Sequence, residues 1–155
     1  MGAPQHETPR HSVSVSGVIL DATATRVLLI QRRDNNHWEP PGGVLELDET
    51  IEDGLRREIV EETGAEVDVL ALTGVYKNMT RGIVNLVYRC RLTTDPASST
   101  DEASAVAWHH LHDVDQLMTP AYAIRVHDAL RGHLAATRAH DGENLAAGST
   151  RASSR

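Results

Sequence analysis

The chain has 155 residues and a mass of 16.9 kDa, which corresponds to a single domain with one hydrophobic core. Hydrophobic residues make up 40% and charged residues 24%, a composition typical of globular proteins that excludes a fibrous or wholly disordered chain. Fifteen basic and 22 acidic residues give a net charge of −7, so general binding to nucleic acid or to an anionic membrane is not expected.

The N-terminal part of the chain predicts a tail followed by a β-hairpin. Residues 1–10 are polar and contain prolines, which is typical of a tail. His11–Leu20 alternates apolar and polar residues, and Arg26–Gln31 is rich in leucine and β-branched residues. Because a turn-forming stretch, Asp21–Thr25, lies between them, these two segments are predicted to pair as antiparallel strands.

Thr50–Thr63 is the clearest predicted helix. Thr50 is a suitable N-cap, with Asp53 three residues later in the position of a capping box, and Gly64 stands where a left-handed C-cap belongs. Gly54 costs the helix about 1 kcal/mol relative to alanine, which suggests close packing at that position. The sequence therefore predicts both ends of this helix.

The rest of the chain predicts further strands, two helical segments and a second tail. Strands interleaved with helices indicate one α/β domain over residues 11–136, a mixed β-sheet sandwiched between α-helices. The exposed edges of such a sheet allow a homodimer. The strands are expected at Val67–Tyr76, Ile83–Leu92 and Ala105–His109, the helical segments at Asp113–Met118 and Ala121–Ala136, and a flexible C-terminal tail at residues 137–155.

The cysteine content and the apolar runs suggest a compartment. Cys90 is the only cysteine, so no intrachain disulfide can form, and the cytoplasm is the expected location. Cys90 lies in an apolar predicted strand and is expected in the core. The apolar runs fall far short of the ~20 residues of a membrane-spanning helix, so no membrane association is predicted.

Glutamates on the predicted helix lie on the side that should face the core. Ile51, Leu55 and Ile59 recur every four residues and form the apolar stripe. At ~100° per residue, Glu58 and Glu62 project close to that stripe instead of the opposite face. Carboxylates one turn apart repel each other, so a helix selected only for stability would not choose this arrangement.

Glu61 adds a third carboxylate, and a divalent cation would reverse the sign of the repulsion. Mg²⁺ prefers carboxylate oxygens, keeps several waters and is completed by substrate phosphates, so the cluster predicts a metal site. The alternative is a solvated helix face. Asp53–Arg57 and Arg57–Glu61 are i,i+4 pairs of the kind that surface helices use.

The segment before the helix favours the metal site. Residues 38–43 (WEPPGG) set a rigid bend that brings backbone close to whatever the glutamates hold. Gly43, five residues, Glu49, seven residues and then residues 57–65 (REIVEETGA) follow one another. This pattern resembles the signature of the Nudix hydrolase family at every fixed position, with Ala65 as its weakest match.

The resemblance implies a fold, a cofactor and a set of site residues. The Nudix fold is a mixed sheet between helices whose loop–helix–loop holds Mg²⁺ or Mn²⁺, and family members hydrolyse a nucleoside diphosphate linked to another group. Arg57 and Glu49 are implied to orient the metal-binding carboxylates. The implied metal ligands are Glu58 and Glu62, then Glu61, and a carbonyl of Gly42 or Gly43.

The expected chemistry is attack of water on a diphosphate phosphorus. A metal cluster that neutralises phosphate oxygens and aligns water lowers the barrier without a covalent intermediate. The general base is left open among Glu58, Glu61 and Glu102. Glu102 resembles a downstream acid that some members use as a metal ligand or base; the alternative is a solvated loop glutamate.

Two residues upstream of the motif are candidates for substrate binding. Arg33 resembles a phosphate-contacting arginine of the MutT-type members, and a plain surface arginine is the alternative. Trp38 could stack on a base at the rim of the site, but packing of its loop onto the core is favoured. A zinc site at His109, His110 and His112 is discounted because adjacent histidines point apart on a strand and no cysteine neighbours them.

These observations lead to one expected function and two alternatives. We expect a Mg²⁺-dependent, MutT-like pyrophosphohydrolase of nucleoside triphosphates or modified nucleotides. The proline and tyrosine that mark the family's ADP-ribose and diadenosine polyphosphate enzymes are absent near Arg81 and Gly82. A dinucleotide polyphosphate or nucleotide-sugar hydrolase is the alternative with the same fold. The other alternative is a non-catalytic sensor that binds a nucleotide, against which the intact glutamates argue.

Overall fold

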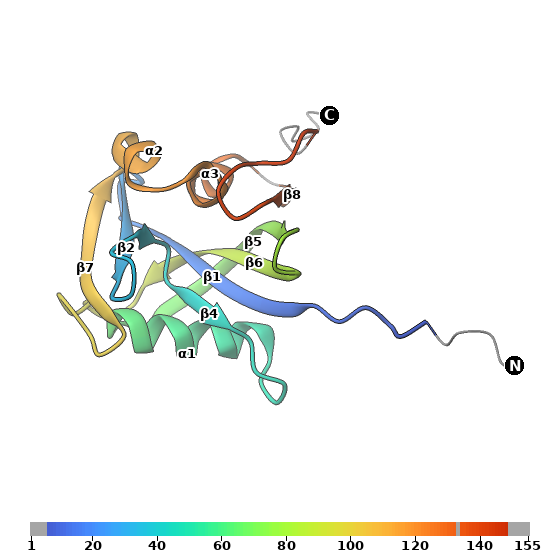
Figure 1. Cartoon of the computed structure of the whole chain (residues 1–155). Helices are drawn as coiled ribbons and strands as arrows, with labels where there is room; N and C mark the ends of the chain where they lie inside the picture. The colour runs from blue at the N-terminus through green and yellow to red at the C-terminus, as the bar shows by residue number, and fades with distance from the viewer. Residues whose placement is uncertain (1–5, 133, 149–155) are drawn as a thin grey trace, which may run out of the picture.

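A computed structural model describes residues 6–132 and 134–148 and shows an α/β fold in three layers. Helix α1 covers one side of a central sheet, and α3 lies on the other side (Figure 1). Along the chain the elements are β1 (Ser12–Leu20), β2 (Arg26–Arg32), β3 (Trp38–Glu39), β4 (Gly42–Val44), α1 (Ile51–Thr63), β5 (Val67–Asn78), β6 (Ile83–Leu92), β7 (Ala103–His110), a 3₁₀ turn (Leu111–Asp113), α2 (Val114–Leu117), α3 (Pro120–Leu130) and β8 (Ala136–His140).

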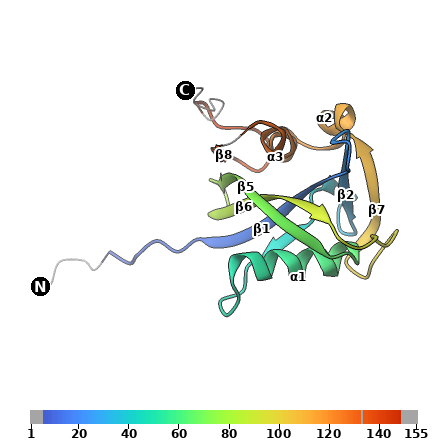
Figure 2. The ribbon, with the colours of Figure 1, turned by 180° about the vertical axis from the view of Figure 1, so that it is seen from behind.

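Within the described residues, the strands form one eight-stranded mixed sheet. The order is β3-β2-β1-β6-β5-β8, with β4 paired to β1 and β7 paired to β2. The β1–β6 and β5–β8 pairs are parallel and the other pairs are antiparallel. The predicted hairpin is confirmed, since Ile19 lies opposite Leu28 in the β1–β2 pair. Seen from behind, β5 and β6 run across the middle of the sheet between the two helical layers (Figure 2).

Each face of the sheet carries its own apolar cluster. Successive side chains of a strand point to opposite faces. Accordingly, Val15 of β1 packs in the cluster that contains Ile59 of α1, whereas Val18 packs in the cluster that contains Val126 of α3. Cys90 is buried in the first cluster, as the sequence predicted. Among the described residues, none of the helices has the length and apolar character needed to cross a lipid bilayer.

Helix α1 begins and ends where the sequence predicts. The Thr50 hydroxyl accepts a hydrogen bond from the Asp53 N–H at 3.2 Å, which is half of the expected capping box. Gly64 has φ = 73° and donates its N–H to the Val60 carbonyl at 2.8 Å, a left-handed C-cap. A Cβ at Gly54 would overlap the Leu45 side chain, so the expected close packing is present.

The C-terminal part differs from the prediction. The helix predicted over Ala121–Ala136 ends at Leu130, and Gly132, with φ = 57°, turns the chain back toward the sheet. The prediction of a tail is wrong for Thr137–His140, which belong to β8 and pair with β5. The stretch from 149 to 155 of the predicted tail lies outside the described residues.

A buried ion pair explains why β8 carries no apolar pattern. Arg138 of β8 donates to both carboxylate oxygens of Asp128 on α3, at 2.7 Å each. The Tyr76 hydroxyl donates to the same carboxylate at 2.7 Å. Both members of the pair are about 2% exposed, so β8 is held in the interior by charge and hydrogen bonds where a hydrophobic side chain would be the usual anchor.

Candidate active site

Two glycines place the backbone of β4 against both β1 and helix α1. Gly42 lies opposite Ser16 of β1, and a Cβ at Gly42 would overlap the Val15 carbonyl. A Cβ at Gly43 would overlap the Glu58 carboxylate. Only glycine allows this approach, so the loop sequence puts the main chain of β4 beside the first acidic side chain of the site.

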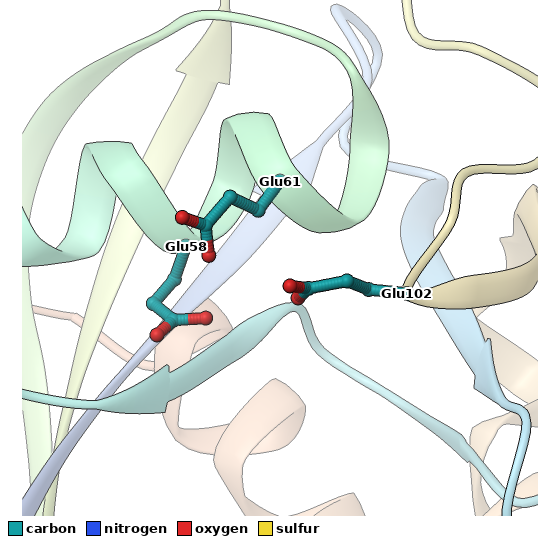
Figure 3. Close-up of side chains that lie close together, drawn as sticks. All are labelled: Glu58, Glu61 and Glu102. Atoms are coloured by element: carbon teal, nitrogen blue, oxygen red, sulfur yellow. The ribbon is translucent and has the colours of Figure 1, made fainter.

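Three carboxylates from two distant segments converge beside this loop. Glu58 and Glu61 come from α1, and Glu102 comes from the residue before β7. Each offers an oxygen atom, and these atoms all lie within 4.8 Å of one another. Figure 3 shows the three side chains pointing toward one another. Like charges at this separation repel unless a cation or a proton lies between them, so the cluster is suited to hold positive charge.

Arg33 holds the segment that carries Glu102. Its guanidinium donates to the carbonyls of Thr100 and Asp101, with a longer bond of 3.4 Å to the Ala103 carbonyl. The guanidinium therefore contacts main-chain carbonyls on both sides of Glu102 along the chain. The structure thus gives Arg33 a positioning contact, and the predicted contact with substrate phosphate stays a prediction.

Arg57 ties the carboxylates of the motif together. It donates to both oxygens of Glu49, at 2.7 and 2.9 Å, and one of its nitrogens reaches Glu58 at 2.9 Å and Glu61 at 3.3 Å. The hydrogen bond from Arg57, with one from the Glu46 N–H, lowers the pKa of Glu49 to about 2. Arg57 therefore contacts Glu49 and two of the predicted metal ligands, and the orienting role that the resemblance implies stays a prediction.

Glu62 lies outside the cluster of three and is more enclosed. Its carboxylate accepts a hydrogen bond from the Gly42 N–H at 3.3 Å. Burial, together with the charges of Glu39, Glu58 and Glu102, raises its pKa to about 8 against the lowering effect of the Gly42 hydrogen bond. Burial also raises the pKa of Glu58, which is only 9% exposed. These two glutamates are thus not the solvated residues of the alternative interpretation.

A cavity of about 750 Å³ lies between β3 and the start of α3, and the described residues that line it do not include the four glutamates of the site. Trp38 and Tyr122 contribute aromatic rings to its wall, and Glu39 links it to the site because its charge acts on Glu62. The Trp38 ring also packs edge-on against the His109 ring, with the centroids 4.4 Å apart. Trp38 therefore both packs onto the core, as favoured from the sequence, and faces the space where a ligand could bind.

Sequence analysis missed several residues of this region. Tyr122 and the buried residues Asn85, Arg125 and His140 lie near the cavity but come from α3, β6 and β8. No spacing along the chain connects them. Glu39 also lines the large cavity and was not predicted as a site residue. Its position between Trp38 and Pro40, immediately before the glycine loop, is the one feature of the sequence that points to this region.

Comparisons with known proteins bear on the family of the chain. The NUDIX domain family profile matches residues 10–129. A MutT-like protein of Streptomyces ambofaciens is 51% identical over 147 residues, which cover 94% of this chain and 95% of that protein. An ADP-ribose pyrophosphatase of Methanocaldococcus jannaschii is 30% identical over 113 residues, which cover 68% of this chain and 66% of that protein.

A solved structure supports the same assignment. The MutT NUDIX hydrolase from Burkholderia pseudomallei has a TM-score of 0.68 and 26% sequence identity, and the match covers 77% of this chain and 98% of that one. The family match, the near-complete coverage of the Streptomyces relative and the shared fold lead to one conclusion. The chain belongs to the NUDIX family and is a hydrolase of nucleoside diphosphate-linked substrates.

Proposed function

We propose that the chain is a Mg²⁺-dependent pyrophosphohydrolase whose substrates are nucleoside triphosphates or modified nucleotides. The observation that carries the proposal is the convergence of Glu58, Glu61 and Glu102 beside the backbone of Gly43. The large cavity that Glu39 lines has the size of a small-molecule pocket, and its two aromatic rings suit a nucleoside.

The residues present fit a hard divalent cation such as Mg²⁺ or Mn²⁺. The donors are oxygens only, and the cradle at Gly43 is one that a Cβ would fill. The cation would be held by Glu58, Glu61 and Glu62, with a carbonyl of Gly42 or Gly43. When bound, the cation supplies charge neutralisation of the phosphate oxygens and alignment of water.

Residues of the chain orient the metal-binding carboxylates and accept the proton of the attacking water. Arg57 holds Glu58 and Glu61 in place through its hydrogen bonds. The Glu102 carboxylate makes no hydrogen bond or ion pair within residues 6–132 and 134–148, so it is free to accept a proton from water. We assign Glu102 as the general base: water forms the new P–O bond, the anhydride P–O bond breaks, and the proton goes to Glu102.

Product analysis over a panel of nucleotides tests the proposal. The panel contains nucleoside triphosphates, dinucleotide polyphosphates and nucleotide sugars, each incubated with Mg²⁺ and with excess chelator. We expect cleavage of triphosphates that Mg²⁺ restores after chelation, with one oxygen from solvent water in a product. Binding of the panel without cleavage over hours would favour the sensor, and cleavage of only the dinucleotides or sugars would favour the other alternative.

A matched pair of variants on α1 tests the role of the site. Glu58→Gln is expected to lower turnover at least ~100-fold, since it removes one charge from the cluster while keeping the shape of the side chain. Glu52→Gln is the control because Glu52 lies on the exposed side of the same helix and pairs with Arg56. A folded Glu58→Gln variant with the activity of the control would contradict the assignment.

A further inference from the structure

The first half of β5 forms an open edge of the sheet. Strand β6 pairs with β5 along its whole length, from Val67 to Asn78, whereas β8 pairs with it only from Gly74 onward. Figure 2 shows β8 beside the end of β5. Among the described residues no other strand pairs with β5, so the outer edge of Val67–Thr73, the open edge, has backbone N–H and C=O groups without a strand partner.

Exposed leucines lie on and beside the open edge. Leu70 and Leu72 of β5 are 48% and 39% exposed. Leu130, the last residue of α3, and Leu134, two residues before β8, are 39% and 76% exposed. Single exposed apolar side chains are common on protein surfaces, but several of them around an unpaired strand are typical of an interface.

The end of α3 lies over the same part of the sheet. Arg89 of β6 lies opposite Ala71 of β5, and its guanidinium donates to the Ala129 carbonyl at 3.3 Å. Ala136, the first residue of β8, lies opposite Gly74, directly after the open edge. The leucines of α3 and of the segment before β8 therefore belong to the same region as those of β5.

The open edge lacks the charges that protect the edge strands of monomeric proteins. Such strands usually carry lysines or inward-pointing charged residues. Asp68 is the one charged residue of Val67–Thr73, and its carboxylate pairs with Arg91 of β6 at 2.7 Å. Two copies can therefore approach along this edge without bringing unpaired like charges together, although each chain carries a net charge of −7.

The open edge is complementary to a second copy of itself. Two antiparallel strands related by a two-fold axis offer each other the same set of donors and acceptors. The edge begins at Val67, the first residue of β5, and ends at Thr73, before β8 begins to pair, so its midpoint is Leu70. An axis at Leu70 places Val67 of each copy opposite Thr73 of the other and uses the whole edge without displacing β8.

We propose that two copies of the chain pair along the open edge, with Leu70 at the two-fold axis. Leu70 of one copy then lies opposite Leu70 of the other, and Leu72 lies diagonally across from it, within reach of contact. The β5–β6 ladder shifts register at Leu70 and at Thr73. These bulges twist the edge and disfavour indefinite stacking of strands, whereas a two-fold contact uses each edge once and closes after two copies.

Sedimentation equilibrium of the full chain between about 1 and 200 μM tests the proposal. We expect a monomer–dimer equilibrium in which the larger species has twice the chain mass of 16.9 kDa. Leu70→Lys should raise the dimer dissociation constant at least ~100-fold, because both leucines at the axis are lost and two like charges then face each other. Leu47→Lys is the matched control, since Leu47 is fully exposed in the loop before α1 and should keep wild-type association.

A cross-link locates the axis. Cys90 is the only cysteine and is buried, so a thiol introduced at the surface reacts first. Leu70→Cys should form a disulfide between two copies under a mild oxidant, because directly opposite residues of antiparallel strands have Cα atoms about 4.5–5.5 Å apart. Met79→Cys, in the exposed turn that follows β5, is the control and should give no cross-linked band on a non-reducing gel.

A monomer over the whole concentration range would leave the open edge to a strand of another protein and would overturn the proposal. So would a dimer that Leu70→Lys leaves intact, or equal cross-linking of Leu70→Cys and Met79→Cys, since the interface then lies elsewhere. If circular dichroism shows that Leu70→Lys does not fold, Leu72→Lys, which changes a neighbouring exposed side chain, takes its place. None of these measurements follows turnover, so the dimer and the proposed hydrolysis are tested separately.

Discussion

Replacing Glu62 by glutamine should stabilise the metal-free protein at alkaline pH. The folded chain binds the Glu62 proton more tightly than the unfolded chain, because burial raises the pKa from 4.5 to about 8. The resulting stabilisation is complete below about pH 4.5 and is lost as the pH rises through 8. Glutamine is neutral at every pH, so the variant does not lose this stabilisation.

The size of the effect follows from the same pKa. A tenfold change in proton affinity equals about 1.4 kcal/mol, so the rise from 4.5 to about 8 corresponds to on the order of 5 kcal/mol when the group is fully ionised. Glu62 is not fully enclosed, and side chains relax around a new charge, so we expect about 2 kcal/mol. For a chain of this length that is a difference of about 4–8 °C in melting temperature.

Thermal unfolding followed by circular dichroism between pH 5 and 8.5 measures this difference. In excess chelator, the wild-type melting temperature should fall relative to that of Glu62→Gln as the pH rises, and Mg²⁺ should remove most of the gap by stabilising the ionised wild-type site. Glu52→Gln on the exposed side of α1 is the control and should follow the wild type. Parallel curves for wild type and Glu62→Gln would refute the reasoning.

Three other substitutions test the supports of the site. Arg33→Gln should free residues 100–103 and raise the Mg²⁺ concentration for half-maximal activity about tenfold, and an unchanged Mg²⁺ titration would contradict the positioning role. Gly43→Ala should lower turnover about 100-fold in a steady-state assay while the chain still folds, because the new Cβ displaces the Glu58 carboxylate. Asp128→Asn should cost about 3–5 kcal/mol in denaturant unfolding because it removes the negative charge with which the buried Arg138 guanidinium pairs.

How far the sequence predicts this protein depends on how local each signal is. Helix α1 is specified by Thr50, Gly64 and an apolar repeat within a single segment, so its two ends are predicted correctly. Strand β8 is buried through Arg138 and its partner on α3, and a buried ion pair leaves no hydrophobic periodicity to detect. Strands β3 and β4 are too short for alternation to be visible.

The same distinction holds for the site. The glutamates of α1 and the glycines before it lie within one motif and were assigned together. The spacing that points to Glu102 is loose, and the structure brings this residue to Glu58 and Glu61 through the loop that Arg33 holds. Asn85, Arg125 and His140 meet only after the sheet and α3 have packed, so no pattern along the chain could identify them as a group.

Strand β8 lies at the end of the sheet, so local unfolding of this strand should depend on whether a ligand is bound. In the described sheet, β5 is the strand that pairs along β8, so β8 can separate without disturbing the remaining strands. Asp141 and Gly142 directly follow β8 and line the large cavity, so that part of its wall is lost whenever β8 detaches. A bound nucleotide should therefore slow amide hydrogen exchange in β8 more than in β1 or β6, and the C-terminal strand becomes a reporter of occupancy some distance from the reacting phosphates.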